Sequence, residues 1–257
     1  MKFVNKFIAL LVLMTVICGC FASCELLNPD GGDVDNLQSD RYVANIKIKY
    51  ATNDEKMKAA INSIGTPTAT LSVNGDDIML VTNAALNNVS VSDEYIYVGG
   101  ILYHSNSLTL GENSYTSQES AAMDSEKCDS LISKAGPGAS IGLGDFLFQE
   151  KNTSGSLVTY TCSEMTDESK ESLCTILSDS FKGLNAIVRI GDVSYQLEVL
   201  DGRNNSSVLS CDLVITMDGV NYDVTMRLYY EYDYDTEVKI TTPQGTYTEV
   251  SLDEIMD

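Results

Sequence analysis

Apolar and polar residues alternate with a period of two along most of the chain after residue 40. In residues 222–234 every second side chain is apolar or aromatic, and those between are mostly polar or charged. Residues 209–217 alternate in the same way, and Asp218-Gly219 stands between the two segments. Such alternation is typical of a strand with one buried and one wet face, and Asp-Gly favours a hairpin turn. We therefore expect an antiparallel hairpin with one shared apolar face.

Further strands are predicted wherever short turns separate similar segments. The turn signals are Asn74-Gly75, Gly99-Gly100, Gly191-Asp192 and Pro243-Gln244-Gly245. They predict four more strand pairs: 68–73 with 77–81, 95–98 with 101–104, 186–190 with 193–200, and 238–242 with 246–251. Strands that follow one another through short turns form an antiparallel meander.

Three segments favour helix instead. The clearest follows Thr166, which is placed to cap a helix whose first turn carries acidic residues suited to the positive end of its dipole. Its apolar stripe comprises Leu173, Ile176, Leu177 and Phe181. A second helix is expected over 120–135, ended by Gly136-Pro137-Gly138, and a shorter one over 54–64.

The fold predicted from these elements is α+β and rich in β-structure. A large sheet with a wet outer face must bury its apolar inner face, so it must curl or be covered by the helices. We expect a large curved antiparallel meander sheet, an incomplete barrel, with two or three short helices covering its concave apolar face. The length favours a single domain over residues 41–257.

The N-terminus has the pattern of an export signal. Lys2 and Lys6 precede an apolar run over 7–17, and cysteines follow at positions 18, 20 and 24. The run is shorter than the roughly 20 residues that a membrane-spanning helix needs. The segment is therefore interpreted as a secretory signal that ends in cysteine, rather than as a membrane span.

This signal resembles that of bacterial lipoproteins, in which a cysteine after small residues is acylated. The resemblance implies that an acylated cysteine holds the protein on a membrane. Cys24 is favoured because the chain turns polar directly after it, and Cys20 is the alternative. Residues 1–23 are then the signal peptide, and 24–40 are an acidic, flexible tether.

The charge of the chain excludes nucleic acid as a partner. The 37 acidic and 16 basic residues give a net charge of −21 at pH 7, which would repel phosphates. Anionic lipid surfaces would repel the chain as well, so we expect it to meet a membrane through its covalent anchor. The acids are spread along the sequence, which is typical of a solvated exterior.

Four cysteines remain if Cys24 is acylated: Cys128, Cys162, Cys174 and Cys211. An even number in an exported domain permits two disulfides, whereas the apolar surroundings of Cys174 and Cys211 equally permit buried free thiols. No C-x-x-C pair is present, and His104 is the chain's only histidine, so neither a metal site nor a cofactor is expected. His104 itself is predicted to lie on the surface at a strand end.

The sequence shows little sign of catalytic chemistry. It contains no P-loop, and a Ser-His-Asp triad would have to use His104, beside which no pattern such as G-x-S-x-G occurs. We therefore expect a binding or interaction protein rather than an enzyme.

The order of the parts is similar to that of extracytoplasmic lipoproteins of the LolA-like and LppX-like half-barrel group. The likeness consists of the acylated N-terminus, the acidic tether, early hairpins, helical segments in the middle and a closing run over 218–251 with a Tyr/Asp-rich strand. It implies a hydrophobic cavity, between curved sheet and helices, that accommodates acyl chains. The residues that would line it are Leu213, Ile215, Val224, Met226 and Leu228 from the sheet, with Leu177 and Phe181 from a helix.

Two functions follow as expectations. The first is a monomer anchored to the outer face of the cytoplasmic membrane, or to an outer membrane if the host has one, that binds a lipid or another apolar small molecule. The alternative is a cell-envelope protein-interaction module, in which the same residues form a filled core and no ligand is bound. The sequence does not identify a protein partner for either.

Overall fold

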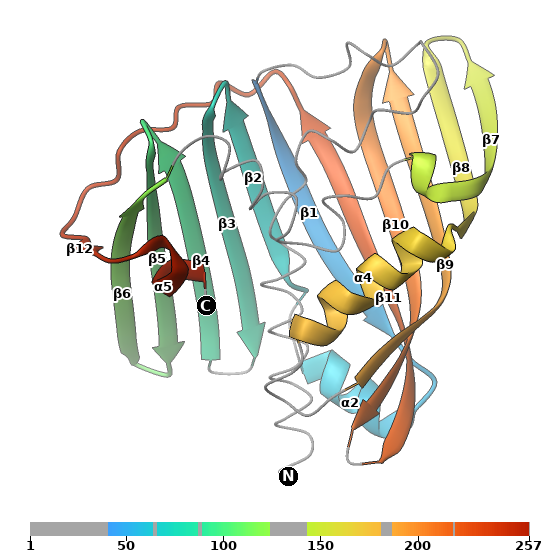
Figure 1. The fold of residues 1–257 in the computed structure, drawn as a ribbon, viewed down its shortest axis with the longest axis horizontal. Helices are drawn as coiled ribbons and strands as arrows, with labels where there is room; N and C mark the ends of the chain where they lie inside the picture. The colour runs from blue at the N-terminus through green and yellow to red at the C-terminus, as the bar shows by residue number, and fades with distance from the viewer. Residues whose placement is uncertain are drawn as a thin grey trace.

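Twelve strands form one continuous curved sheet (Figure 1). The computed structural model of the protein describes residues 41–63, 66–86, 89–123, 143–180, 187–217 and 219–256. The strands are β1 (Arg41–Ala51), β2 (Thr68–Asn74), β3 (Asp77–Leu86), β4 (Val89–Val98), β5 (Ile101–Leu110), β6 (Asn113–Ala122), β7 (Phe146–Ser154), β8 (Leu157–Met165), β9 (Ile187–Leu200), β10 (Arg203–Met217), β11 (Val220–Asp233) and β12 (Thr248–Glu249).

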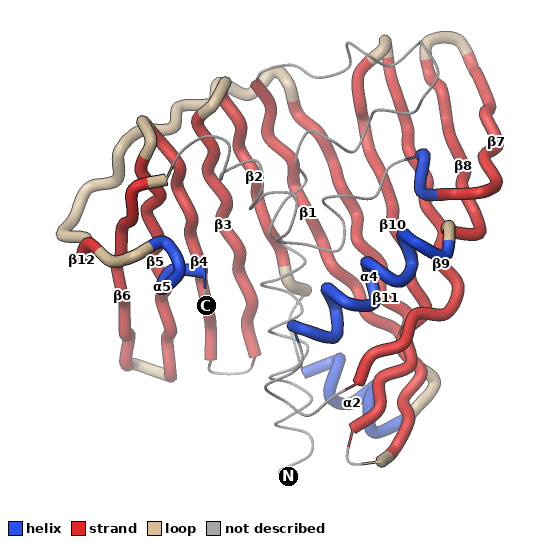
Figure 2. The backbone as a smooth tube through the Cα atoms, in the orientation of Figure 1, coloured by secondary structure: helices blue, strands red, loops and turns tan. Residues whose placement is uncertain are grey.

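The first strand, β1, lies in the middle of the sheet. The strand order is β12-β6-β5-β4-β3-β2-β1-β11-β10-β9-β8-β7, so two meanders meet where β1 pairs with β11 (Figure 2). All pairs are antiparallel except that of β12 with β6. The predicted fold class is confirmed, because the protein is β-rich, with a large open antiparallel sheet and few short helices.

The helices of the described chain are short: α2 (Glu55–Ser63), α4 (Asp167–Ser180) and α5 (Leu252–Met256), with a 3₁₀ turn, η1 (Leu143–Asp145). α4 packs against β9, α5 against β6 and α2 against β1. α4 and α5 lie on the same face of the sheet, which we call the inner face (Figure 1). Thr166 caps α4 as predicted, because its Oγ1 accepts a hydrogen bond from the Ser169 N–H at 3.3 Å.

Cross-strand register collects apolar side chains on the inner face. Leu228 of β11 stands between Leu209 of β10 and Ile48 of β1, and Leu71 of β2 stands opposite Leu80 of β3. All five are at most 2 % exposed and belong to one core cluster. Burial of an apolar side chain of this size stabilises the fold by about 1.5–3 kcal/mol. The inner face is therefore the main source of stability.

The C-terminal segment after β11 runs from one face of the sheet to the other, around the β6 edge (Figure 1). Val238 and Ile240 pack on the outer face against Ile96. β12 then pairs with β6, and Ile255 of α5 packs on the inner face against Leu102. This segment therefore covers the β6 edge.

The predicted hairpin of 238–242 with 246–251 is wrong. Of these residues only Thr248–Glu249 form a strand, and it pairs in parallel with β6. Val238 and Ile240 alternate with polar residues because they are buried against the outer face of the sheet, not because they pair in a ladder. Alternation records which side chains are buried, and an irregular segment lying on a sheet can produce it too.

The predicted turn at Gly191-Asp192 is also wrong, because these residues form a β-bulge inside the single strand β9. Both face Asp212 of β10, where the register shifts between Cys211 and Leu213. A Cβ on Gly191 would stand 3.3 Å from the backbone oxygen of Asp212, so the close approach of the strands favours glycine. Glycine beside aspartate is typical of turns and bulges alike.

The remaining elements were predicted unevenly. The helix over 54–64 is confirmed as α2, whereas the helix over 120–135 was placed too early, because residues 120–122 belong to β6. The remainder of that helix, after Met123, lies outside the described residues. The sequence patterns did not predict β1, β6, β7 or β8.

Candidate functional site

The predicted cavity residues of the sheet lie together on the inner face. They are Leu213, Ile215, Val224, Met226 and Leu228, each at most 2 % exposed. Cross-strand pairing brings Leu213 opposite Val224, and all five share one core cluster with Leu173 of α4. Leu177 belongs to α4, and Phe181 lies outside the described residues. The strand residues are thus brought together as expected, inside a packed cluster.

The apolar inner face is wider than the described helices that lie on it. The most extensive helix–sheet contacts are those of α4 with β9 and α5 with β6, toward opposite ends of the sheet. Between these strands the inner face carries small and large apolar side chains in continuous rows, among them Ala44, Ile46, Ile48, Ala69, Leu71 and Leu80. Such a surface makes no directional demands, so it suits an acyl chain as well as it suits protein side chains.

A polar cluster interrupts the inner face on β4, β5 and β6. His104 Nε2 lies 2.6 Å from the Asp93 carboxylate, which also accepts a hydrogen bond from Asn106 Nδ2 at 3.3 Å. The other ring nitrogen of His104, Nδ1, is buried without a hydrogen bond and lies 3.9 Å from a Glu119 oxygen. The ring stacks on Tyr95 with centroids 4.4 Å apart. We name these five residues the His104 cluster.

The structure corrects the predicted position of His104. It lies in the middle of β5 rather than at a strand end, and its side chain is only 14 % exposed. Both ring nitrogens face carboxylate oxygens, on Asp93 and Glu119. Such an imidazole is held in place by its neighbours.

The three described cysteines of the possible disulfides are free: Cys162, Cys174 and Cys211. β9 separates Cys162 on β8 from Cys211 on β10, so about two strand spacings, roughly 9.5 Å, lie between these strands. A disulfide needs Cα atoms about 4.4–6.8 Å apart. The thiol of Cys174 donates instead to the backbone oxygen of Val188 at 3.2 Å. The free-thiol alternative holds for these three, and Cys128 lies outside the described residues.

Burial of the two strand thiols predicts a loss of stability in alkali. Burial raises the pKa of Cys162 to about 11, and burial with the nearby Asp212 charge raises the pKa of Cys211 to about 12. The unfolded thiols have a pKa near 9.0. Their contribution to stability is therefore complete below pH 9 and is lost as the pH rises toward 11 and above, because only the unfolded chain then releases the protons.

This effect is measurable by urea denaturation between pH 7 and pH 10.5. We expect the free energy of unfolding to fall across this range, and to fall less steeply in Cys211→Ala than in the wild type. Cys174→Ala removes a thiol in the middle of α4 instead, and it is the matched control. Equal slopes for wild type and Cys211→Ala would contradict the assignment.

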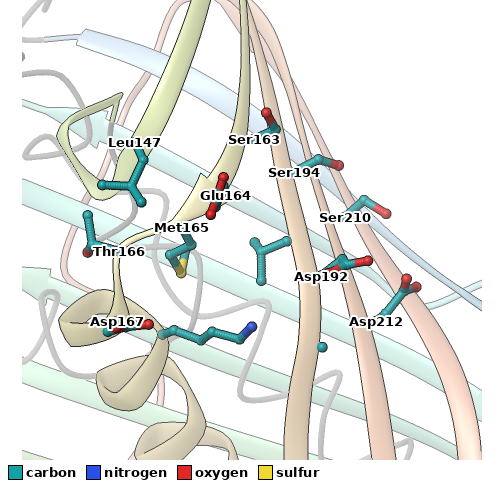
Figure 3. Close-up of a pocket in the computed structure, with 13 residues that line it drawn as sticks. Leu147, Ser163, Glu164, Met165, Thr166, Asp167, Asp192, Ser194, Ser210 and Asp212 are labelled. Atoms are coloured by element: carbon teal, nitrogen blue, oxygen red, sulfur yellow. The ribbon is translucent and has the colours of Figure 1, made fainter.

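A cleft of about 810 Å³ opens where β8 leaves the sheet and the chain enters α4 (Figure 3). β8 pairs with β9 only as far as Ser163 opposite Ser194. The chain then turns away at Glu164, whose φ is 61°. We name this the α4–β9 cleft, and its lining residues are Leu147, Ser163, Glu164, Met165, Thr166, Asp167, Lys170, Gly191, Asp192, Val193, Ser194, Ser210 and Asp212.

The α4–β9 cleft is polar and mainly acidic. Figure 3 shows Ser163, Ser194 and Ser210 in a row across three strands, which agrees with their cross-strand pairing. Four carboxylates line the cleft, from Glu164, Asp167, Asp192 and Asp212, against the one ammonium of Lys170. Sequence reasoning missed this site because β8 and the bulge of β9, which create it, were not predicted.

The lipidation candidates Cys20 and Cys24 lie outside the described residues. Within the part of the chain that is described, no helix is long and apolar enough to cross a membrane. No group of three or more His, Cys, Asp or Glu side chains there is arranged to hold a metal ion. A scan against protein-family models and a search of curated proteins both found no match to this chain.

Proposed function

We propose that the protein is a lipid-anchored extracytoplasmic binding protein that holds a lipid or another apolar small molecule between its curved sheet and helices. The observation that carries the proposal is the width of the apolar inner face, which continues across the middle strands between the contacts of α4 with β9 and of α5 with β6. The lipoprotein-like N-terminus and the likeness to half-barrel lipoproteins point the same way.

An amphipathic ligand matches the distribution of polarity on the inner face. The rows on β9, β10, β11, β1 and β2 are largely apolar, whereas β4, β5 and β6 carry the His104 cluster. An acyl chain would lie along the apolar rows, where it needs no hydrogen bonds. A polar head group would face Asp93, His104 and Glu119, which offer donors and acceptors.

A specific observation favours the alternative, a protein-interaction module with a filled core. The five strand residues expected to line the cavity are at most 2 % exposed, in a packed cluster. If protein side chains fill all of this space, the inner face is ordinary core. The two functions predict different effects on ligand binding and on stability when a small side chain of the inner face is replaced by a larger one.

Ala44 offers the test, because it is fully buried on the inner face opposite Leu71 and Tyr232. If a ligand chain lies against it, Ala44→Phe should weaken binding of dansylundecanoic acid about tenfold or more while the melting temperature of the ligand-free protein stays close to that of the wild type. If the core is filled, the same substitution should destabilise the fold by about 1–3 kcal/mol through overpacking. The readouts are dansyl fluorescence and thermal denaturation.

Ala85→Phe is the matched control, since Ala85 is exposed on β3, which β2 separates from β1. It should change neither binding nor stability. A wild-type protein that fails to bind the probe, together with a destabilised Ala44→Phe, would overturn the binding function and favour the interaction module.

A further inference from the structure

The two edges of the sheet are treated differently by the chain. At the β6 edge, the C-terminal segment adds β12 in parallel, and the Val250 N–H donates to the Ser120 oxygen at 2.9 Å. At the other edge, β7 is the last strand, and no described strand pairs with its outer side. One edge is therefore covered and the other is open within the described residues.

The open strand β7 has little of the protection usual at an edge. It is nine residues long, contains no proline, and every side chain after Phe146 is exposed. Leu147 and Phe148, at its start, are 60 % and 59 % exposed. Natural edge strands are commonly short, charged, bulged or covered, because their unpaired backbone groups otherwise recruit another strand. The charges of β7 are limited to Glu150 and Lys151.

The charges of β7 disfavour those symmetric pairings with a second copy of this chain that centre on Glu150 or on Lys151. A symmetric antiparallel pair of two β7 strands over their full length would place Glu150 opposite the same residue of the other copy. If the two-fold axis were moved by one residue toward the end of the strand, Lys151 would stand opposite Lys151 of the other copy. Like charges directly opposite one another destabilise a strand pair.

The α4–β9 cleft adjoins the start of this edge. Leu147 belongs to β7 and also lines the cleft, so edge and cleft form one surface. Glu164, Asp167 and Asp192 are exposed in the cleft, where Lys170 is the one basic side chain. A lysine or arginine side chain is the charge complement of this lining.

We propose that the β7 edge accepts an extended segment of a partner protein as an additional strand. Apolar side chains of the segment rest on Leu147 on one face of β7 and on Phe148 on the other, and a lysine or arginine beyond them enters the α4–β9 cleft beside Asp192. Backbone hydrogen bonds to β7 supply affinity, and the apolar contact and the cleft charges supply specificity, as in other strand-addition complexes. The surface is separate from the inner face and does not depend on the apolar-ligand function.

The test uses the full 257-residue chain with Cys20→Ser and Cys24→Ser to prevent acylation. The probe is a fluorescein-labelled peptide of sequence TVKVRVKVT, and binding is read as fluorescence anisotropy at 20 and 200 mM NaCl. We expect saturable binding that weakens with salt. The double substitution L147T/F148T and the single substitution D192K should each weaken it about tenfold or more. These positions are exposed, so circular dichroism should show unchanged folding.

Matched variants and a modified probe separate strand addition from non-specific attraction. Tyr115→Thr removes an equally exposed large side chain at the opposite end of the sheet, and Asp76→Lys reverses a charge on an exposed turn; both should bind as the wild type does. The same peptide with alternate amides N-methylated keeps its charge but cannot donate to a strand, so it should lose binding.

Three results would overturn the proposal. The first is equal binding of the N-methylated probe, and the second is an equal loss of affinity in the control variants. The third is a wild-type chain that elutes as a dimer and becomes a monomer in L147T/F148T, which would assign the edge to a second copy.

Discussion

Leu228→Ala is expected to lower the free energy of unfolding by about 2–5 kcal/mol, as large-to-small core substitutions do. Leu228 is fully buried on the central strand β11, with Leu209 and Ile48 as its direct cross-strand neighbours. Truncation removes apolar contact on both sides and leaves a cavity that two rigid strands cannot close. Urea denaturation followed by circular dichroism measures the effect.

Leu110→Ala is the control for this prediction. Leu110 ends β5 and is 42 % exposed, so its truncation should change the free energy of unfolding by no more than about 0.5 kcal/mol. If Leu228→Ala and Leu110→Ala lowered the free energy of unfolding equally, Leu228 would be no more buried than Leu110. That result would contradict the position of β11 at the centre of the buried face.

Asp93→Ala should destabilise the protein by about 1–3 kcal/mol, because it leaves buried donors without an acceptor. Asp93 is 3 % exposed and accepts hydrogen bonds from His104 and Asn106. Replacing both partners is expected to cost less than the sum of the single changes, since no buried ring nitrogen is then left unpaired. The comparison is therefore among D93A, H104F and the double variant D93A/H104F.

Chemical denaturation of these three variants gives the coupling free energy between Asp93 and His104. Asp76→Ala, at an exposed turn, controls for the loss of one acidic residue. Strictly additive effects of D93A and H104F would show that the two side chains do not interact in solution, contrary to their 2.6 Å contact.

Local patterns predicted the hairpins whose turns are two-residue connections that contain glycine. Gly99-Gly100 joins β4 to β5 with positive φ at both positions, 59° and 81°, a conformation that glycine adopts without strain. The β10–β11 hairpin and α4 with its Thr166 cap follow from equally local signals. In each case the residues that decide the structure are neighbours in the sequence.

The parts that sequence reasoning missed depend on distant residues. Gly191 forms a bulge rather than a turn because Asp212, on another strand, is positioned to oppose it. The central position of β1 depends on its pairing with β11, which lies near the other end of the sequence. His104 was assigned to a strand end because the strand was taken to stop there, yet the Gly99-Gly100 turn already fixes its register opposite Tyr95.

The candidate sites divide in the same way. The apolar inner face could be predicted residue by residue, because alternation in 209–217 and 222–234 marks its members. The α4–β9 cleft could not be predicted in this way. It exists only because the pairing of β8 with β9 stops at Ser163 and the chain then leaves the sheet to enter α4. Its carboxylates are spread from Glu164 to Asp212 and form no local motif.

Native mass spectrometry of the mature chain tests the central claim most directly, because it reads the mass of whatever the inner face holds. The protein would be exported to a bacterial periplasm without its lipid anchor and purified without detergent. The account predicts a species heavier than the polypeptide by the mass of one lipid, which organic extraction removes. A single species at the polypeptide mass, unchanged after incubation with vesicles of phosphatidylethanolamine and phosphatidylglycerol, would contradict it.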